Sequence, residues 1–310
     1  MEPPASRVDV VTGAFSYTGR FIARRLLADG RRVRTLTNHA NRPGTEDLQK
    51  ELEVEPLQFD DHERLVVSLR GAATLYNTYW VRFPHGGLDF DRAVANTRKL
   101  MQAAAEAGVR KVVHISVSNP SLDSPLAYYA GKARTEELVK ESGLAWAIVR
   151  PTLVFAPGDI LINNIAWMVR RMPVFGMPGL GRYRVQPVSA EDVADIAVTS
   201  ANQPDNVTVD AAGPEIITFA ELVDQIVIAV GRRPRFVYLP PGMFIAAGRL
   251  IGLAVRDVVL TRQELEGLMA ELLISSEPPR GVQRFDDWLL RCSDQLGLRY
   301  ASELDRHFRR

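Results

Sequence analysis

Apolar and polar residues alternate along the first half of the chain in two repeating patterns. Short apolar runs, typical of strands buried on both faces of a sheet, occur at residues 8–11, 33–36, 54–57, 74–76, 112–115 and 147–149. Between them, apolar residues return every three or four positions, as on one face of a helix, at residues 21–28, 63–69, 90–107 and 134–141. The alternation predicts an α/β fold with a Rossmann-type, doubly wound parallel sheet in the strand order 3-2-1-4-5-6. Ligands then belong at the carboxyl ends of strands 1, 4 and 5.

The pattern changes after Arg150 and Pro151, where prolines and glycines become frequent. We therefore predict a Rossmann domain over residues 1–156 and a smaller C-terminal α+β lobe, which would hold a substrate, over residues 157–310. A helical stretch at residues 190–203 is expected to return to the first domain. The apolar stretch at residues 243–260 is interrupted by glycines and charges, so it is too short to span a bilayer. Its pattern favours a core or oligomer contact over a membrane-surface helix.

The first strand runs through a turn of small residues into an amphipathic helix. Gly13 supplies a tight turn, and Gly19 lets the helix pack closely against the strand. The N–H groups at the start of such a helix bind pyrophosphate well. Ser16 stands where the middle glycine of the usual pattern would be. The segment predicts a dinucleotide-binding turn, with an ordinary strand-turn-helix as the alternative.

A tyrosine and a lysine stand four residues apart, so a helix would place Tyr128 and Lys132 on one face. A nearby ammonium lowers the pKa of a phenol from its reference of about 10, as a proton donor to a carbonyl requires. Two serines, Ser116 and Ser118, follow the fifth strand, and Ser118 is better placed to face the crevice. The alternative is that Tyr128 packs the start of a helix.

Together these motifs resemble the short-chain dehydrogenase/reductase superfamily, in its extended and atypical branch. Within that branch the chain is similar to NAD(P)-binding proteins related to the nucleotide-binding accessory subunit of respiratory complex I, and to NmrA-like proteins. The residues that carry the resemblance are Thr12, Gly13, Gly19, Arg20, Asp60, Asp61, Asn96, Tyr128, Lys132, residues 149–152 and residues 186–194.

The resemblance implies an NAD(P)-dependent oxidoreductase or epimerase that transfers hydride with Tyr128 as its acid/base. Ser118 would orient the substrate carbonyl, and Lys132 would bind the nicotinamide ribose. Asp60 would accept a hydrogen bond from the adenine amino group, and Pro151 would lie against the nicotinamide. The residues expected to bind the cofactor are Gly13, Phe15, Ser16, Tyr17, Thr18, Gly19, Asn38, Arg42, Asp60, Asp61, Asn77, Thr78, Lys132 and Pro151.

The sequence departs from the family pattern at three places. Ser16 replaces a glycine, and Ala156 stands where glycine commonly follows the Arg-Pro-Thr motif. The bulky residues 77–80 follow the fourth strand, where small residues usually lie beside the nicotinamide. These departures motivate a second hypothesis, in which the protein is an NAD(P)H-binding regulator, or an accessory or assembly factor of a larger complex, without turnover.

The choice of cofactor follows from charge. An acidic residue about twenty residues past the first glycine would bind a ribose 2′-hydroxyl and repel a 2′-phosphate. Here no carboxylate occurs after the second strand until Glu46, whereas Asn38 and Arg42 are present. This favours NADP(H) and leaves NAD(H) open. The alternative is that Arg42 is a solvated loop residue.

The amino-acid composition excludes several classes of ligand and partner. The 38 Lys and Arg residues nearly balance the 37 Asp and Glu residues, without a long charged block, which argues against nucleic acid as a partner. The single cysteine excludes an internal disulfide, and the five histidines lack short ligand spacings, so we expect no metal site. We expect a small carbonyl or sugar-like substrate or a protein partner, and a homodimer is left open. Residues 1–6 lack a signal-peptide pattern and no transmembrane run occurs, which predicts a cytoplasmic protein.

Overall fold

The computed structural model describes residues 8–40, 42 and 44–307, so the segment used to argue against a signal peptide lies outside it. The chain divides into two compact units, one formed by Met1–Pro151 and Ala190–Ala211 and the other by Thr152–Ser189 and Ala212–Arg310. The first of the two stretches of this unit thus ends at Pro151, whereas the sequence placed the boundary after residue 156. The reason is that β7 (Leu153–Phe155) pairs in parallel with β10 (Pro187–Ser189) of the second unit.

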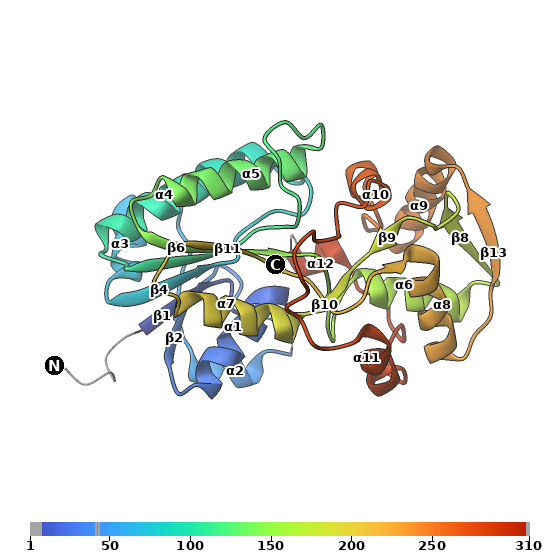
Figure 1. The fold of residues 1–310 in the computed structure, drawn as a ribbon, viewed down its shortest axis with the longest axis horizontal. Helices are drawn as coiled ribbons and strands as arrows, with labels where there is room; N and C mark the ends of the chain where they lie inside the picture. Colours follow the sequence, from blue (N-terminus) through green and yellow to red (C-terminus); the bar gives the residue numbers. More distant parts are fainter. Residues whose placement is uncertain (1–7, 41, 43, 308–310) are drawn as a thin grey trace. The chain divides into compact units, whose positions relative to one another are not determined.

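The first unit is built on a seven-stranded parallel sheet in the order β11-β6-β5-β4-β1-β2-β3 (Figure 1). Its strands are β1 (Val8–Thr12), β2 (Arg32–Leu36), β3 (Glu53–Glu55), β4 (Ala72–Asn77), β5 (Lys111–Ile115), β6 (Ala145–Pro151) and β11 (Val207–Ala211). The order confirms the predicted doubly wound sheet. It adds β11 beyond β6, a strand that the apolar pattern did not indicate because its first three residues are only partly buried.

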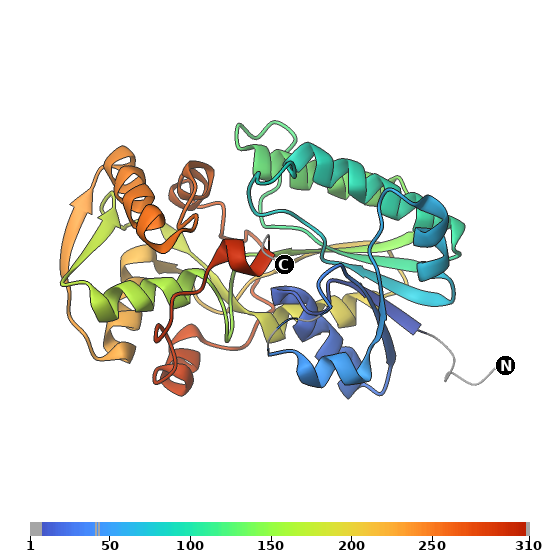
Figure 2. The same cartoon turned by 180° about the vertical axis from the view of Figure 1, so that it is seen from behind.

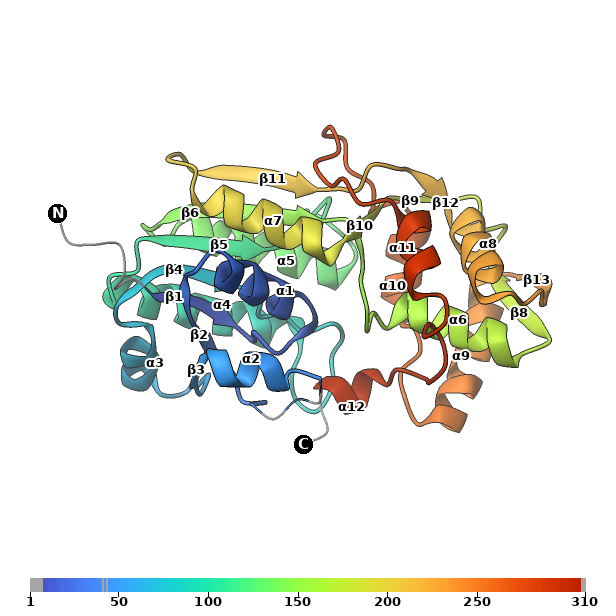
Figure 3. The same cartoon turned by 90° about the horizontal axis from the view of Figure 1, so that it is seen from below.

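Helices cover both faces of this sheet (Figure 1, and from behind in Figure 2). One layer is formed by α3 (His62–Leu69), α4 (Phe90–Glu106) and α5 (Ala127–Lys140), and α1 (Tyr17–Ala28) packs with α7 (Ala190–Ala201) on the other face (Figure 3). The short α2 (Glu46–Glu51) lies between β2 and β3 in the chain. The helix expected at residues 134–141 starts earlier, at Ala127, so it includes both Tyr128 and Lys132.

The second unit mixes short strands and helices, with three two-stranded pairs: β7 with β10, β8 with β13, and β9 with β12. Its further elements are α6 (Leu161–Arg171), β8 (Val174–Pro178), β9 (Arg184–Val185), β12 (Ile217–Thr218), α8 (Phe219–Val230), β13 (Arg235–Leu239), α9 (Pro241–Val255), α10 (Arg262–Met269), α11 (Phe285–Cys292) and α12 (Glu303–His307). Its core gathers Phe155, Ile226, Phe285 and Trp288, and the last two rings stack with centroids 5.9 Å apart.

Helix α9 shows that the core contact expected for residues 243–260 is wrong, whereas the oligomer contact stays open. Of its residues, all of which the structure describes, only Gly252 is buried, so the stretch at 243–260 does not supply a core helix. No helix in the described part of the chain is long and apolar enough to cross a membrane.

Candidate functional site

The turn after β1 has the geometry of a phosphate-binding loop. Gly13 adopts φ +66°, a left-handed conformation that favours glycine, and its N–H donates to the Leu36 carbonyl at 2.9 Å. Helix α1 then begins at Tyr17 without an acidic residue in its first turn, and its N-cap residue Ser16 makes no side-chain cap bond. The positive end of the helix dipole is therefore not compensated by a carboxylate of that turn, which suits an anionic ligand.

Gly19 explains why the turn stays so tight. A Cβ atom at Gly19 would lie only 2.2 Å from the carbonyl oxygen of Gly13, so no larger residue fits without moving the backbone. The Ser16 hydroxyl lies near the same two glycines, 3.4 Å from the Cβ position of Gly13 and 3.1 Å from that of Gly19. The serine is thus accommodated inside the turn. The residues present fit a pyrophosphate group held at the start of α1.

A chain of buried hydrogen bonds fixes the neighbouring strand ends. Thr12 Oγ1 donates to Asn77 Oδ1 at 3.2 Å and accepts from the Thr78 N–H at 2.8 Å. Asn77 Nδ2 lies 3.0 Å from His114 Nδ1, and His114 Nε2 lies 3.1 Å from Thr135 Oγ1. The network ties β1, β4 and β5 to α5, which rigidifies the carboxyl edge of the sheet.

The protonation state of His114 follows from its partners. The Thr135 hydroxyl donates to the Lys132 carbonyl at 2.7 Å, so it accepts from His114 Nε2–H and leaves Nδ1 to accept from Asn77. Burial holds the pKa of His114 well below its usual value, with the nearby Lys132 charge acting in the same direction. A fully buried histidine in a strand is a signal that sequence reasoning overlooked, because the residue was weighed only as a metal ligand.

Lys132 is buried at the carboxyl edge, where its ammonium meets two groups. Nζ donates to the Ile115 carbonyl at 2.9 Å and lies 4.8 Å from the centroid of the Trp80 ring. Burial lowers the pKa of Lys132 to about 7, and the Glu136 carboxylate only partly offsets this. Glu136 itself is held by Arg150, whose Nε and Nη2 donate to its two oxygens at 2.9 and 2.6 Å.

Trp80 lies beside both members of the predicted catalytic pair. Its ring makes an edge-to-face contact with Tyr128, with centroids 5.9 Å apart, and stacks on Phe90 at 5.8 Å. A Cβ atom at Gly131 would lie 2.8 Å from the Trp80 ring, so the indole presses directly on α5 between Tyr128 and Lys132. The sequence indicated bulk after β4, but it did not predict that this bulk would cover the lysine.

The serines and Pro151 lie at the same edge of the sheet. Ser118 is fully buried, and its N–H donates to the Pro151 carbonyl at 2.9 Å. The hydroxyl of Ser116, also buried, has no hydrogen-bond partner among the described residues. A buried hydroxyl without a hydrogen bond costs free energy, so a bound carbonyl could supply the missing partner. Ser116 is therefore a candidate group for holding a carbonyl, together with Ser118.

Several residues expected at the cofactor already have structural partners. The Asn38 side chain donates to the Leu57 carbonyl at 2.8 Å and accepts from the Leu57 N–H at 3.2 Å, which joins the ends of β2 and β3. Asp60 is exposed and paired with Lys99 at 3.0 Å, which lowers the pKa of its carboxyl. Asp61 is the N-cap of α3 and accepts from the Arg64 N–H at 3.0 Å.

The remaining predicted residues lie around the turn and the loop after β2. Phe15 is buried, whereas Tyr17, Thr18 and Arg42 are half-buried. Arg20 places its guanidinium 5.6 Å from the ring centroid of Tyr17. The structure therefore brings the turn, the ends of β4 and β5, and α5 to one edge of the sheet, while Arg42 follows the end of β2.

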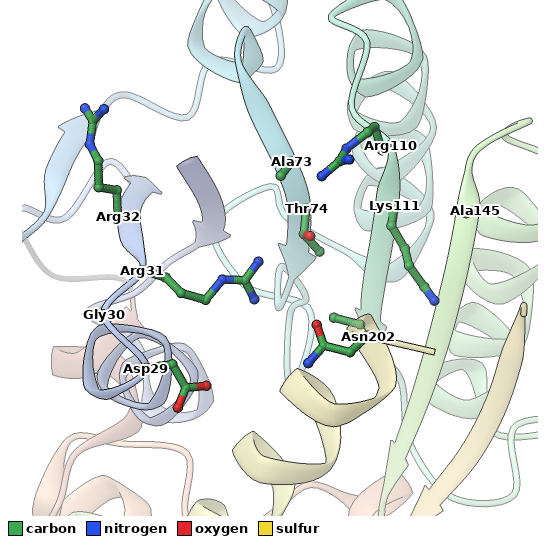
Figure 4. Close-up of a pocket in the computed structure, with 11 residues that line it drawn as sticks. Asp29, Gly30, Arg31, Arg32, Ala73, Thr74, Arg110, Lys111, Ala145 and Asn202 are labelled. Atoms are coloured by element: carbon green, nitrogen blue, oxygen red, sulfur yellow. The ribbon is translucent and has the colours of Figure 1, made fainter. Parts of the chain in front are cut away.

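A cavity of about 740 Å³ lies in the first unit at the opposite, amino-terminal edge of the sheet (Figure 4). Among its cationic side chains, Arg31 pairs with the buried Asp9 at 2.6 Å, and Lys111 Nζ donates to the Gln203 carbonyl at 2.5 Å. None of the predicted site residues lines it, so it is not the candidate site.

Comparison with known proteins then decides the family. The model of a family described as NAD(P)H-binding matches residues 13–204, which include the turn, the strand ends and α5. The chain belongs to this family.

This NAD(P)H-binding protein also has curated relatives. It is 26% identical over 277 residues to the NADH-ubiquinone oxidoreductase 40 kDa subunit of Neurospora crassa mitochondria, covering 86% of this chain and 72% of that one. It is 27% identical over 259 residues to the ceramide reductase of Caulobacter vibrioides, covering 81% and 79% of the two chains. The resemblance to complex I accessory subunits is thereby confirmed.

A solved structure shows the same fold. The NAD(P)H-binding protein superposes on the triphenylmethane reductase of Citrobacter sp., solved with NADP(H), with a TM-score of 0.74. The match covers 93% of this chain and 99% of that one at 15% identity, so it establishes the shared fold alone.

The lowered pKa of Lys132 makes stability depend on pH. Its folded-state pKa of about 7 lies below the ordinary value of 10.5, so between these values the unfolded chain binds more protons and wild-type stability rises with pH. We expect the stability of Lys132→Met relative to wild type to fall across this window, by at most about 1.4 kcal/mol per pH unit. Urea unfolding at a series of pH values measures this, and a stability difference that does not change with pH would contradict it.

Proposed function

We propose that this protein is an NADPH-dependent oxidoreductase or epimerase of the extended and atypical short-chain dehydrogenase type. The observation that carries the proposal is the meeting of three features at one edge of a single sheet. These are the tight turn at Gly13 and Gly19, the buried strand end at Ser116 and Ser118, and the helix bearing Lys132. The family model spans all three.

In this proposal each residue of the site has its own role. NADPH, when bound along the turn, would supply the hydride. Tyr128 would donate a proton to the substrate oxygen, or accept one in the reverse direction, and the Lys132 ammonium would lower the pKa of that phenol. Ser118, with Ser116 as a second hydroxyl, would hold the carbonyl in place. The substrate class that fits is a small carbonyl or sugar-like compound.

Arg42 supports the choice of NADPH, because the chain offers a cation and no carboxylate directly after β2. We expect Arg42→Ala to weaken NADPH binding about tenfold or more, as loss of a charge-assisted hydrogen bond to phosphate would. NADH affinity should stay unchanged, since NADH lacks the 2′-phosphate. Titration followed by nicotinamide fluorescence measures both.

The matched control is Arg98→Ala, which removes an exposed arginine on α4. It should leave both affinities unchanged. Equal loss of NADPH and NADH binding in Arg42→Ala would assign that arginine a structural role. Equal affinity of the wild-type protein for NADPH and NADH would contradict the proposed preference for NADPH.

One observation favours a second function. Trp80 lies over the Lys132 ammonium and against Tyr128, the two groups that the first function assigns to the nicotinamide ribose and to the substrate. A protein that keeps this arrangement would bind NAD(P)H without turnover and act as a regulator, or as an accessory or assembly factor of a larger complex. The 40 kDa relative, named as a subunit of NADH-ubiquinone oxidoreductase, is consistent with this role.

The two functions differ in what they require. Reduction of any member of a carbonyl panel with NADPH supports the enzyme. Tight NADPH binding without turnover, together with a stable protein partner, supports the accessory role. A cytoplasmic location is a prediction for either function, and a homodimer is left open.

A further inference from the structure

Helix α9 of the second unit presents an apolar stripe to the outside. Met243, Leu250 and Leu253 are 59, 68 and 77% exposed, and Ala246 between them is exposed as well. Their spacing of three or four residues places them on one helix face. We call these four residues the α9 stripe. A surface helix normally turns a polar face to water, so an apolar stripe of this kind is a candidate contact surface.

The opposite face of α9 is also apolar and is already occupied. Phe244 lies at Gly176 of β8, where a Cβ atom would be 3.7 Å from its ring, and Gly252 packs on the Asp257 carbonyl. Rotation of the helix would bury the stripe only by exposing Phe244, so one of the two apolar faces is exposed in either orientation. The helix contacts β8 and β13 (Figure 1), and the exposed fractions of the stripe residues place the stripe on its outer side.

Arginines flank the stripe. At about 100° per residue, Arg249 lies roughly a quarter turn from Leu250, at the margin of the stripe, and Arg256 is the left-handed C-cap residue at the end of the helix. Both are exposed, and neither pairs with a carboxylate within the part of the chain that the structure describes. Guanidinium groups beside an exposed apolar face can reach the headgroups of an anionic bilayer while the apolar side chains enter its surface.

The charge of the surrounding sequence has the same sign. Residues 225–262 hold six arginines and one acidic residue, Asp257, and of these arginines Arg262 pairs with Glu266 at 2.7 Å. Asp257 is buried and accepts hydrogen bonds from the Tyr300 hydroxyl and from the N–H groups of Glu303 and Leu304, so it does not offset the arginines at the surface. This segment therefore offers cations and no exposed carboxylate.

We propose that the α9 stripe and its flanking arginines dock this protein on the surface of a membrane that contains anionic lipid. A second copy of the chain is the less favourable occupant, because it would bring the same arginines to the interface without carboxylates to match them. Anionic headgroups supply that match, and the four apolar side chains enter the boundary between headgroups and acyl chains.

Flotation of the protein with vesicles tests the proposal. One set contains phosphatidylcholine alone and the other contains phosphatidylglycerol as well. We expect binding to the anionic vesicles, weakened by added salt, and reduced about tenfold or more when Leu250→Glu and Leu253→Glu are combined. Arg249→Ala with Arg256→Ala should weaken binding to anionic vesicles alone. The matched control is Leu290→Glu, which alters a leucine of α11 that is 73% exposed and should change nothing.

The variants alter exposed side chains, and retained NADPH affinity and thermal unfolding temperature verify that they fold. Absence of binding to anionic vesicles would overturn the proposal, as would equal binding by the double variant. Analytical ultracentrifugation at several protein concentrations tests whether a second copy of the chain binds the stripe instead. A wild-type dimer that the leucine variants dissociate, without vesicle binding, would assign the stripe to a second copy and would also overturn it.

Discussion

Tyr128→Phe should lower turnover by about 10²-fold or more, because it removes the one proton that the proposed acid can transfer and leaves the ring in place. NADPH affinity should stay within a few-fold, since the phenol hydroxyl is assigned to the substrate and Lys132 to the ribose. The contact between the Tyr128 and Trp80 rings survives in the variant, so the fold is retained. Steady-state reduction of the best substrate from a carbonyl panel, with NADPH titration alongside, measures both.

Tyr129→Phe is the matched control. Tyr129 is the next residue of α5 and is buried, so the same atom is removed one position away from the proposed site. Turnover should persist in this control. Full activity in Tyr128→Phe would remove the tyrosine from the mechanism, and absence of turnover in the wild type despite NADPH binding would favour the accessory role.

The second large effect is expected from Gly19→Ala, which should abolish NADPH binding. A Cβ atom 2.2 Å from the Gly13 carbonyl forces α1 away from the turn, and overpacking of this kind typically costs about 1–3 kcal/mol of stability. The N–H groups at the start of α1 then no longer converge on the pyrophosphate. Calorimetric titration with NADPH and thermal unfolding measure the two consequences.

Gly248→Ala provides the matched control for Gly19→Ala. Gly248 also lies inside a helix, but no atom stands within 4 Å of the Cβ position there. Alanine should therefore leave NADPH binding intact and raise stability by up to about 1 kcal/mol through its higher helix propensity. If Gly19→Ala bound NADPH like the wild type, the assignment of this turn to the cofactor would fail.

Local pattern was sufficient for much of this protein. The alternation of apolar runs and helical spacings predicted the order of β1 to β6, because parallel strands joined by helices have few right-handed arrangements. The turn at Gly13 and Gly19 was readable because it depends on backbone freedom at two positions. The four-residue spacing of Tyr128 and Lys132 placed them on one helix, since helix geometry is fixed by sequence separation.

Contacts between residues far apart in sequence decided the rest. Trp80 covers Lys132 across 52 positions of sequence, and the Asn38 amide is taken by the Leu57 backbone, and neither contact has a local signal. The exposure of the α9 stripe also has no local signal. The same apolar helix sequence is compatible with an outer face that packs in a core, on a partner or on lipid. The sequence by itself determined the sheet, the tight turn at Gly13 and Gly19 and the helix of the candidate pair. Only the tertiary structure decided which polar groups are already satisfied and which apolar face is left outside, because both depend on packing between distant segments.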